Sequence, residues 1–240
     1  MNIYIDRLES IFTLNKVCHS HGIDHAISVM NNSKKAIKCC DFKLNQNVIK
    51  CILLASLLHD ADDRKFFPNN FKYENVKKIL FDMDNDSVNL IIKMISLVSS
   101  AVNGDNIPYN IEEWMFYPRY SDRLEAIGFI GIKRCYQYAV TFNNKLYTDK
   151  TLFADNEEDL WKIATIQRYR NYKGDSESMI DHYYDKLLRA GDFPIRNNFF
   201  DEESKIRKQI SINFIINCAI NKDCLTYYIN NYFINECLKY

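Results

Sequence analysis

Apolar residues recur three and four positions apart through long stretches of the chain, a spacing that places them on one face of an α-helix. Glycine and proline, which interrupt helices, number only 6 and 4 among the 240 residues. All-β proteins use both residues freely in turns, so their scarcity argues against strands. We therefore predict an all-α fold, with helices in the segments 25–40, 48–59, 88–98, 122–139, 178–190 and 206–220.

The length and composition of the chain are those of one large domain. Hydrophobic residues make up 47% of the sequence, enough to bury a core without disulfides. No internal repeat divides the chain, and its clearest loops are residues 66–70 and 103–110. We predict a single helical bundle over residues 1–195, with a C-terminal helical extension over residues 196–240 packed on it.

The charge of the chain is balanced, with 31 basic and 31 acidic residues and no long run of lysine or arginine. Binding to nucleic acid usually relies on excess positive charge, so we expect no nucleic-acid partner. Asp6 and Glu9 interrupt the apolar pattern of the N-terminus, which therefore differs from a signal peptide. No stretch approaches the roughly 18 apolar residues that span a bilayer, so we expect a cytoplasmic protein with no membrane partner.

The 8 cysteines fall mostly within apolar helical patterns, and no two of them form a CxxC pair. Cysteines in such positions usually serve as small buried hydrophobic residues. Their spacings also differ from those of known structural zinc sites. We therefore expect free thiols rather than a disulfide framework or a cysteine-bound zinc ion.

The strongest chemical signal is the end of the apolar segment LLASLLHDADDRKF, residues 53–66. His59 and Asp60 terminate this segment, and Asp62 and Asp63 follow within three residues. Burying so many ionisable groups at the end of an apolar helix is costly unless they have partners. A metal ion provides such a partner, because it accepts imidazole nitrogens and carboxylate oxygens together.

Two further segments supply candidate ligands. His21 and His25 are four residues apart, a spacing that places both on one face of a helix. The spacing matches that of the zinc-peptidase HExxH motif, but Gly22 occupies the position of the required glutamate, so we exclude a peptidase. Asp122 begins an apolar helical segment, where a carboxylate could also serve only to favour the helix dipole. Gly128 and Gly131, three residues apart, would allow a second helix to approach this segment closely.

The order His25, His59-Asp60, Asp122 resembles the signature of the HD superfamily of metal-dependent phosphohydrolases. Four blocks carry a closer resemblance, to a bacterial subfamily similar to the YedJ and YpgQ proteins. These blocks are HGIDHAISV (21–29), LLHDADDRKF (57–66), DRLEAIGFIGIKR (122–134) and HYYDKLL (182–188). The chain departs from the subfamily pattern at Gly22, Ser28, Tyr120 and Glu125.

The resemblance implies that one divalent metal ion, which could be Mn, Ni, Co, Fe, Zn or Mg, is bound by His25, His59, Asp60 and Asp122. It also implies a phosphohydrolase that acts on nucleotides, in the form of a (deoxy)nucleoside triphosphate pyrophosphohydrolase or a related phosphoester hydrolase. A non-catalytic HD module that binds a nucleotide or a metal is the alternative. The expected partner is the small-molecule substrate. The expected oligomeric state is a monomer or a homodimer.

Residues near the expected ligands provide candidates for the chemistry. Asp63 is positioned to orient or deprotonate the attacking water, and Lys65 to bind phosphate as a flexible cation. His182 and Lys186 are four residues apart and would face the same side of a helix. We expect four residues to contact the substrate: His21, Arg64, His182 and Lys186.

Overall fold

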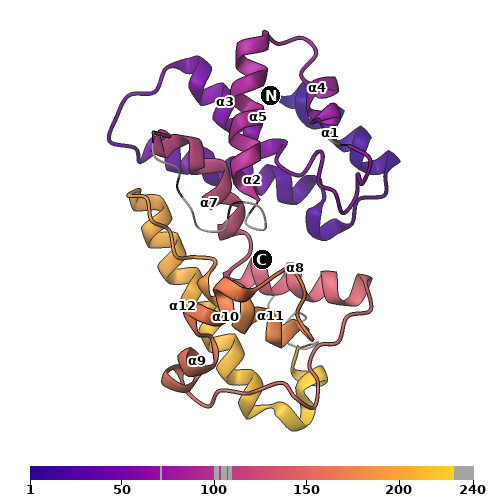
Figure 1. The fold of residues 1–240 in the computed structure, drawn as a ribbon, viewed down its shortest axis with the longest axis vertical. Coiled ribbons are helices and arrows are strands. Elements are labelled where there is room, and N and C mark those ends of the chain that lie inside the picture. The colour runs from indigo at the N-terminus through magenta and orange to yellow at the C-terminus, as the bar shows by residue number, and fades with distance from the viewer. Residues whose placement is uncertain (71, 100–102, 104–106, 108–109, 230–240) are drawn as a thin grey trace. The chain divides into compact units, whose positions relative to one another are not determined.

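The computed structural model describes residues 1–70, 72–99, 103, 107 and 110–229 (Figure 1). These residues form helices, turns and loops, with no strand among them, and the predicted all-α fold is confirmed. By their internal contacts the residues form two compact units, one of residues 1–125 with 193–203 and the other of residues 126–192 with 204 onward. The bundle over residues 1–195 with an extension from 196 stays a prediction.

The first unit contains the N-terminal helices. Its elements, in chain order, are α1 (Asn2–Leu14), η1 (His19–His21), α2 (Ile23–Lys38), α3 (Gln46–Leu57), α4 (Glu74–Ile79), α5 (Asn85–Val98), η2 (Glu113–Phe116) and α7 (Tyr117–Leu124). The first residues of α12 (Asn198–Ile220) also belong to this unit.

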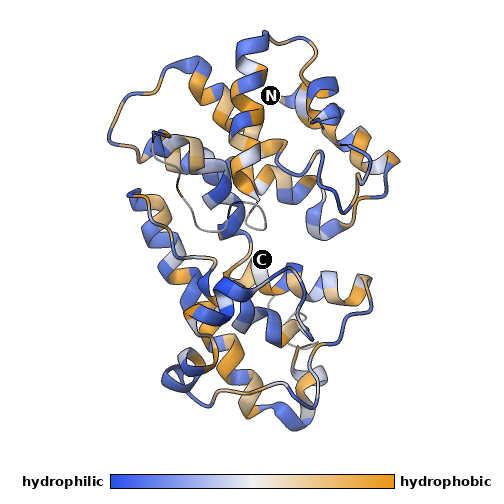
Figure 2. Cartoon of the chain, in the orientation of Figure 1, coloured by the Kyte–Doolittle hydropathy of each residue, from blue (hydrophilic) through white to orange (hydrophobic). Residues whose placement is uncertain are grey.

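Helix α3 is the central element of the first unit. The side chain of Asn45 caps its N-terminus by accepting a hydrogen bond of 2.8 Å from the backbone N–H of Val48. Ile52, Leu54 and Leu57 are fully buried, and α2, α5 and α7 all pack against α3. Figure 2 shows the apolar stretches of α3 and α5. Burial on several sides explains why the α3 sequence is apolar almost throughout.

The second unit contains α8 (Gly128–Thr141), α9 (Glu157–Ile163), α10 (Ile166–Asn171), α11 (Met179–Asp185), η3 (Leu187–Arg189), most of α12 and η4 (Lys222–Cys224). Ile180, Tyr183 and Phe214 are among the buried residues of its core. The side chain of Ser178 caps α11 by accepting a hydrogen bond of 3.2 Å from the backbone N–H of Asp181.

The single helix predicted for residues 122–139 is wrong, because α7 ends at Leu124 and α8 begins at Gly128. Gly128 has a φ of +70°, in the left-handed region that favours glycine. A Cβ atom at Gly128 would also lie 2.8 Å from the Cβ of Arg207 in α12, so the expected close approach of a helix is present at this glycine, whereas the atoms nearest to Gly131 are the backbone of Ala126. Asp122 therefore lies near the C-terminal end of its helix, not at its beginning.

Two further corrections concern the segment 178–190 and the placement of His21. The segment 178–190 contains α11, which ends at Asp185, and η3, since Lys186 leaves the helix with φ −143° and ψ −56°. The segment 25–40 corresponds to α2, whereas His21 lies in the separate element η1. Residues 66–70 form the expected loop, and most of the loop 103–110 lies outside the described residues. Within the described part of the chain, no helix is long and apolar enough to cross a membrane.

Candidate metal centre

The four candidate ligands of the HD pattern all lie in the first unit. His25 is in the first turns of α2, His59 and Asp60 follow the end of α3, and Asp122 is in the last turn of α7. These three helices pack against one another. The apolar faces of α2 and α3 bury the two imidazoles, whose side chains are 2% and 1% exposed. The carboxylates of Asp60 and Asp122, 14% and 31% exposed, form the side of the site that solvent reaches.

The carboxylates of Asp60 and Asp122 both approach the Nε2 atoms of His25 and His59. The Nε2 atoms of His25 and His59 are 3.2 Å apart. A carboxylate oxygen of Asp60 lies 3.8 Å from the first nitrogen and 3.3 Å from the second. An oxygen of Asp122 lies 3.3 Å and 3.6 Å from the same two nitrogens. The sequence spreads these residues over about a hundred positions, and the fold brings them into one cluster.

The spacing of these atoms fits a bound metal ion. Ligand atoms about 2.1 Å from a metal lie roughly 3.0 Å apart at a right angle and roughly 3.8 Å apart at about 130°. The observed separations of 3.2–3.8 Å fall within this interval. Among the described residues, the group whose ligand atoms all lie within 4.8 Å of one another consists of His25, His59 and Asp60, and Asp122 approaches the two histidines from outside this group.

A backbone contact prepares His59 for ligation. Its Nδ1 lies 2.8 Å from the carbonyl oxygen of Ser56. Because a carbonyl oxygen can only accept, Nδ1 carries the proton, and in the neutral ring Nε2 presents its lone pair to the centre of the cluster. Metal-bound histidines commonly have this arrangement, in which a carbonyl or carboxylate oxygen accepts a hydrogen bond from the other ring nitrogen and fixes the tautomer and the ring orientation.

Without a metal ion, the same contacts couple the charges of the site. Burial alone would lower the pKa of His59, but the carboxylates of Asp60 and Asp122 raise it well above its ordinary value. Burial would raise the pKa of both aspartates, yet the histidines hold the pKa of Asp60 and Asp122 below the usual range. A metal ion bound at this cluster would therefore compete with protons for the imidazole nitrogens.

The acidic residues after Asp60 have different surroundings. The carboxylate of Asp62 accepts hydrogen bonds from the backbone N–H groups of Asn75 and Val76, each at 3.0 Å. Asp62 therefore caps α4 from a distant part of the sequence. Asp63 accepts a hydrogen bond of 2.9 Å from the backbone N–H of Lys65. Burial and the charge of Asp60 raise the pKa of Asp63.

Three other residues are expected near the cluster. His21 precedes His25 in the sequence, and Arg64 and Lys65 follow Asp60. The ring of His21 lies 6.3 Å from that of His25 and 5.3 Å from that of Phe66, as measured between centroids. His21 is thus beside the cluster although it is not on the helix of His25. Arg64 and Lys65 are exposed in the loop that follows Asp60.

His182 and Lys186 belong to the second unit. The helical spacing predicted to align them does not apply, because α11 ends between them. Both nevertheless contact the ring of Tyr172, with the His182 centroid at 5.4 Å and the Lys186 Nζ at 5.7 Å. Nδ1 of His182 also lies 3.2 Å from the hydroxyl of Ser176.

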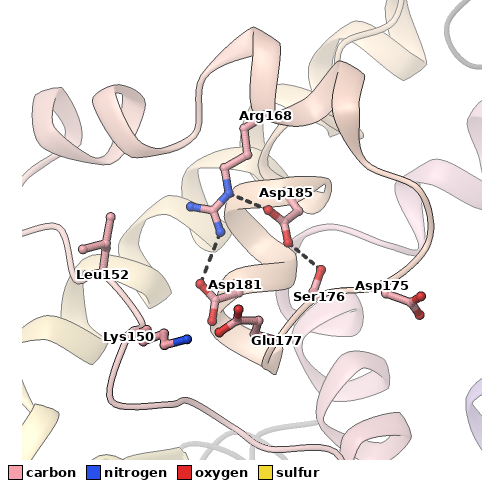
Figure 3. A pocket seen from close by; sticks show the side chains of 8 residues that line it. All are labelled: Lys150, Leu152, Arg168, Asp175, Ser176, Glu177, Asp181 and Asp185. Atoms are coloured by element: carbon pink, nitrogen blue, oxygen red, sulfur yellow. Dashed lines mark hydrogen bonds and ion pairs between the residues drawn. The ribbon is translucent and has the colours of Figure 1, made fainter.

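A pocket of about 340 Å³ lies beside these residues in the second unit (Figure 3). The guanidinium of Arg168 reaches between two carboxylates there, at 2.5 Å from Asp185 and 3.2 Å from Asp181. Asp181 also accepts hydrogen bonds from Thr151 and Ser178. Asp181 and Asp185 thus form ion pairs and hydrogen bonds with residues of the same unit.

Tyr120, one of the positions that depart from the subfamily pattern, is a core residue. It is fully buried, with its ring centroid 4.9 Å from that of Phe193 and 6.0 Å from that of Phe200. Glu125, another of these positions, is buried and accepts a hydrogen bond of 2.8 Å from the side-chain amide of Asn32. The packing around α7 therefore accommodates both departures from the subfamily pattern.

Sequence reasoning did not identify the buried serines behind the cluster: Ser33, Ser56 and Ser121. The available signal was the presence of a serine inside an otherwise apolar helix face, as in LLASLLHD. Such a residue needs a buried hydrogen-bond partner. No pattern in the sequence indicates which segments supply that partner.

Comparison with solved structures defines the class of fold. A protein of Lactobacillus plantarum matches with a TM-score of 0.61 and 19% identity over 99% of each chain. An HD-superfamily hydrolase of Bacillus thuringiensis matches with a TM-score of 0.58 and 18% identity over 91% of this chain and 94% of that one. Bacillus subtilis YpgQ in complex with ADP matches with a TM-score of 0.60 and 19% identity over 92% and 96%. The chain has the fold of the HD superfamily, and the resemblance inferred from the sequence is confirmed.

A sequence relative defines the family more narrowly. No family model matches the chain. An uncharacterized protein of Acanthamoeba polyphaga mimivirus is 37% identical to it over 229 residues, which cover 86% of this chain and 91% of that protein. The chain belongs to the family of this mimivirus protein.

Proposed function

We propose that the protein is a divalent-metal-dependent phosphohydrolase that acts on nucleotides. The observation that carries this proposal is the cluster of His25, His59, Asp60 and Asp122, in which the two Nε2 atoms lie 3.2 Å apart and a carboxylate oxygen of each aspartate lies 3.3–3.8 Å from both. Imidazole with carboxylate suits Mn, Fe, Co, Ni or Zn, and Mg less well. When bound, such an ion would neutralise charge on a phosphoryl oxygen and lower the pKa of water.

Nucleotides are the substrate class that the comparisons support, because Bacillus subtilis YpgQ, which shares the fold, has been solved in complex with ADP. In the proposed reaction, water attacks the α-phosphorus of a (deoxy)nucleoside triphosphate. The bond from that phosphorus to the bridging oxygen breaks, and pyrophosphate leaves with the bond electrons. The products are a nucleoside monophosphate and pyrophosphate, and the water proton passes to a base.

Asp63 is the residue we assign as that base. It lies in the turn after Asp60, where the backbone N–H of Lys65 holds one of its carboxylate oxygens at 2.9 Å. Burial, the larger cause of its raised pKa, makes it a stronger proton acceptor than an exposed aspartate. A carboxylate at this position would orient the water and then accept its proton.

Lys65 is the residue we assign to the phosphates of the substrate. Its exposed position in the loop after the ligands leaves room for a flexible cation to follow a phosphate chain. Four residues are proposed to complete substrate binding: His21, Arg64, His182 and Lys186. His21, beside His25, has the most direct structural support among them.

The experiment that tests this function is a screen of nucleoside mono-, di- and triphosphates with Mn²⁺, Co²⁺, Ni²⁺ and Mg²⁺, with the products separated by ion-exchange chromatography. We expect a nucleoside monophosphate and pyrophosphate in equal amounts, and no product from the His59→Ala variant. Orthophosphate as the product would indicate a phosphomonoesterase instead of a pyrophosphohydrolase. Stoichiometric nucleotide binding without any product would contradict the catalytic proposal and support a binding module.

A further inference from the structure

The three helices that carry the metal ligands are joined behind the cluster by a row of buried hydroxyl groups. The hydroxyl of Ser33 in α2 lies 2.7 Å from that of Ser56 in α3 and 2.8 Å from that of Ser121 in α7. The hydroxyl of Ser56 also lies 2.8 Å from the carbonyl oxygen of Ile52, one turn back in α3. All three serines are fully buried.

Each end of this row is directly connected to a ligand. The backbone carbonyl of Ser56 accepts the hydrogen bond from Nδ1 of His59, at 2.8 Å. Ser121 precedes Asp122 in the chain, so any shift of its backbone moves that ligand. Ser33 lies on the buried face of α2, the helix that carries His25. The row therefore includes one residue from the helix of each of the three ligand segments.

A second polar contact supports the same pair of helices. The side-chain amide of Asn32, next to Ser33 in α2, donates hydrogen bonds to Glu125 at 2.8 Å and to the backbone carbonyl of Ser121 at 3.4 Å. Asn32 and Glu125 are both buried. The interface between α2 and α7 thus contains directional polar contacts in addition to its apolar packing.

Hydrogen bonds in a buried interface fix the relative positions of packed helices more closely than apolar packing does. Apolar side chains gain similar free energy over a range of sliding positions, whereas buried hydroxyls must meet their partners within a few tenths of an ångström. Each hydroxyl donates one proton, so removal of the central one leaves both neighbours with one partner fewer. The row therefore fixes the positions of α2, α3 and α7 along one another.

We propose that Ser33, Ser56 and Ser121 are positioning residues that set the distances between the metal ligands. This inference rests on the metal site of the proposed function. The ligand atoms approach one another within 3.2–3.8 Å only if the three helices keep their present offsets. Loss of the row should therefore weaken metal binding even in a protein that remains folded.

The test is a calorimetric titration of the full-length protein with Mn²⁺ alone, on the wild type and on the Ser33→Ala variant. Outer-shell partners of metal ligands typically change metal affinity by about 10–100-fold, and we expect a loss of about tenfold or more. Ser121→Ala, which removes one contact instead of two, should give a smaller loss in the same direction. It also provides a second test if Ser33→Ala does not fold.

The matched control is Ser211→Ala in the second unit. Ser211 is also buried, and its hydroxyl accepts a hydrogen bond of 2.8 Å from the backbone N–H of Gly128. This variant also loses a buried hydroxyl, and thermal unfolding shows whether its loss of stability is comparable. We expect its Mn²⁺ affinity to stay within about twofold of the wild type, a difference that marks no effect on the scale of outer-shell changes.

Three results would contradict this account, and they have different meanings. If Ser33→Ala and Ser121→Ala bind Mn²⁺ as tightly as the wild type, the serines only stabilise the fold and the inference is wrong. If the wild type itself binds no Mn²⁺, or binds it equally well after His59→Ala, the metal site and with it the proposed function fail. A loss of affinity shared equally by Ser211→Ala would also overturn the positioning role.

Discussion

Asp62 gives the sharpest prediction about the loop that carries the ligands, because the structure assigns this acidic residue a role different from that of Asp60. Its carboxylate accepts two backbone hydrogen bonds at the start of α4, from Asn75 and Val76, and a third of 2.8 Å from the side chain of Asn70. We therefore expect Asp62→Ala to destabilise the fold by removing a cap that is 13 and 14 residues away in sequence.

The magnitude follows from these three contacts. Loss of a helix cap costs about 0.5–2 kcal/mol, typically about 1 kcal/mol. The bond from Asn70 contributes about 1 kcal/mol more, as a net hydrogen bond to an accessible carboxylate. Asp62→Ala should thus lower the free energy of unfolding by about 1.5–3 kcal/mol. For a chain of this size that corresponds to a decrease in Tm of roughly 3–12 °C.

Urea denaturation followed by circular dichroism measures this loss, and hydrogen exchange locates it. The backbone amides of Asn75 and Val76 should exchange faster in Asp62→Ala, because their acceptor is absent. Asp62→Asn is the matched control, since its side-chain oxygen can still cap a helix and should retain much of the stability. A loss below about 0.5 kcal/mol, the usual effect of a surface substitution, would refute the non-local cap.

Three further predictions concern the metal site and its chemistry. Asp63→Asn should retain bound metal, shown by elemental analysis, yet lower kcat by about 10²-fold or more, and unchanged turnover would exclude Asp63 as the base. Lys65→Ala should mainly raise KM in steady-state kinetics if the lysine binds ground state and transition state alike, whereas a decrease in kcat with unchanged KM would give it a role in the transition state. Metal affinity should decrease as pH falls, because Asp60 and Asp122 raise the pKa of His59 and only the neutral imidazole binds metal. Release of one proton would change the Kd by about tenfold per pH unit, measurable by titration between about pH 6 and 8, and an affinity that does not vary there contradicts the coupling.

The helices of the first unit could be predicted well because burial and periodicity agree there. Helix α3 is apolar on nearly every face, and its sequence changes abruptly to His59-Asp60 where the helix ends. A cluster of ionisable residues after an apolar helix is a local signal, and it identified two of the four ligand candidates. The order of the motif blocks identified the other two, His25 and Asp122, through a family resemblance.

The break between α7 and α8 could not be predicted from the same pattern. Ile127, in the connecting turn, is fully buried, so the apolar spacing continues through a segment that is not helical. The turn depends on the positive φ of Gly128, and a Cβ at Gly131 would lie 2.3 Å from the carbonyl of Ala126. Spacing alone does not distinguish a glycine that ends a helix from one that admits a neighbouring helix.

The contacts that organise the site are the part that local sequence reasoning could least supply. Asp62 caps a helix that begins twelve residues later, and Ser33 meets a serine 88 residues away. No periodicity encodes such pairs, because they arise when separate helices pack. The acidic residues of HDADD are alike in the sequence, and only the fold shows that Asp62 caps α4 while Asp60 faces the histidines.

Crystals of the protein grown or soaked with Mn²⁺ and measured at the manganese absorption edge test the central claim most directly. We expect one anomalous difference peak in the first unit, about 2.0–2.3 Å from Nε2 of His25, Nε2 of His59 and carboxylate oxygens of Asp60 and Asp122. The His59→Ala variant treated in the same way should show no peak at that position. The account would be contradicted by a wild-type map in which manganese at saturating concentration is absent from this cluster or bound at other residues.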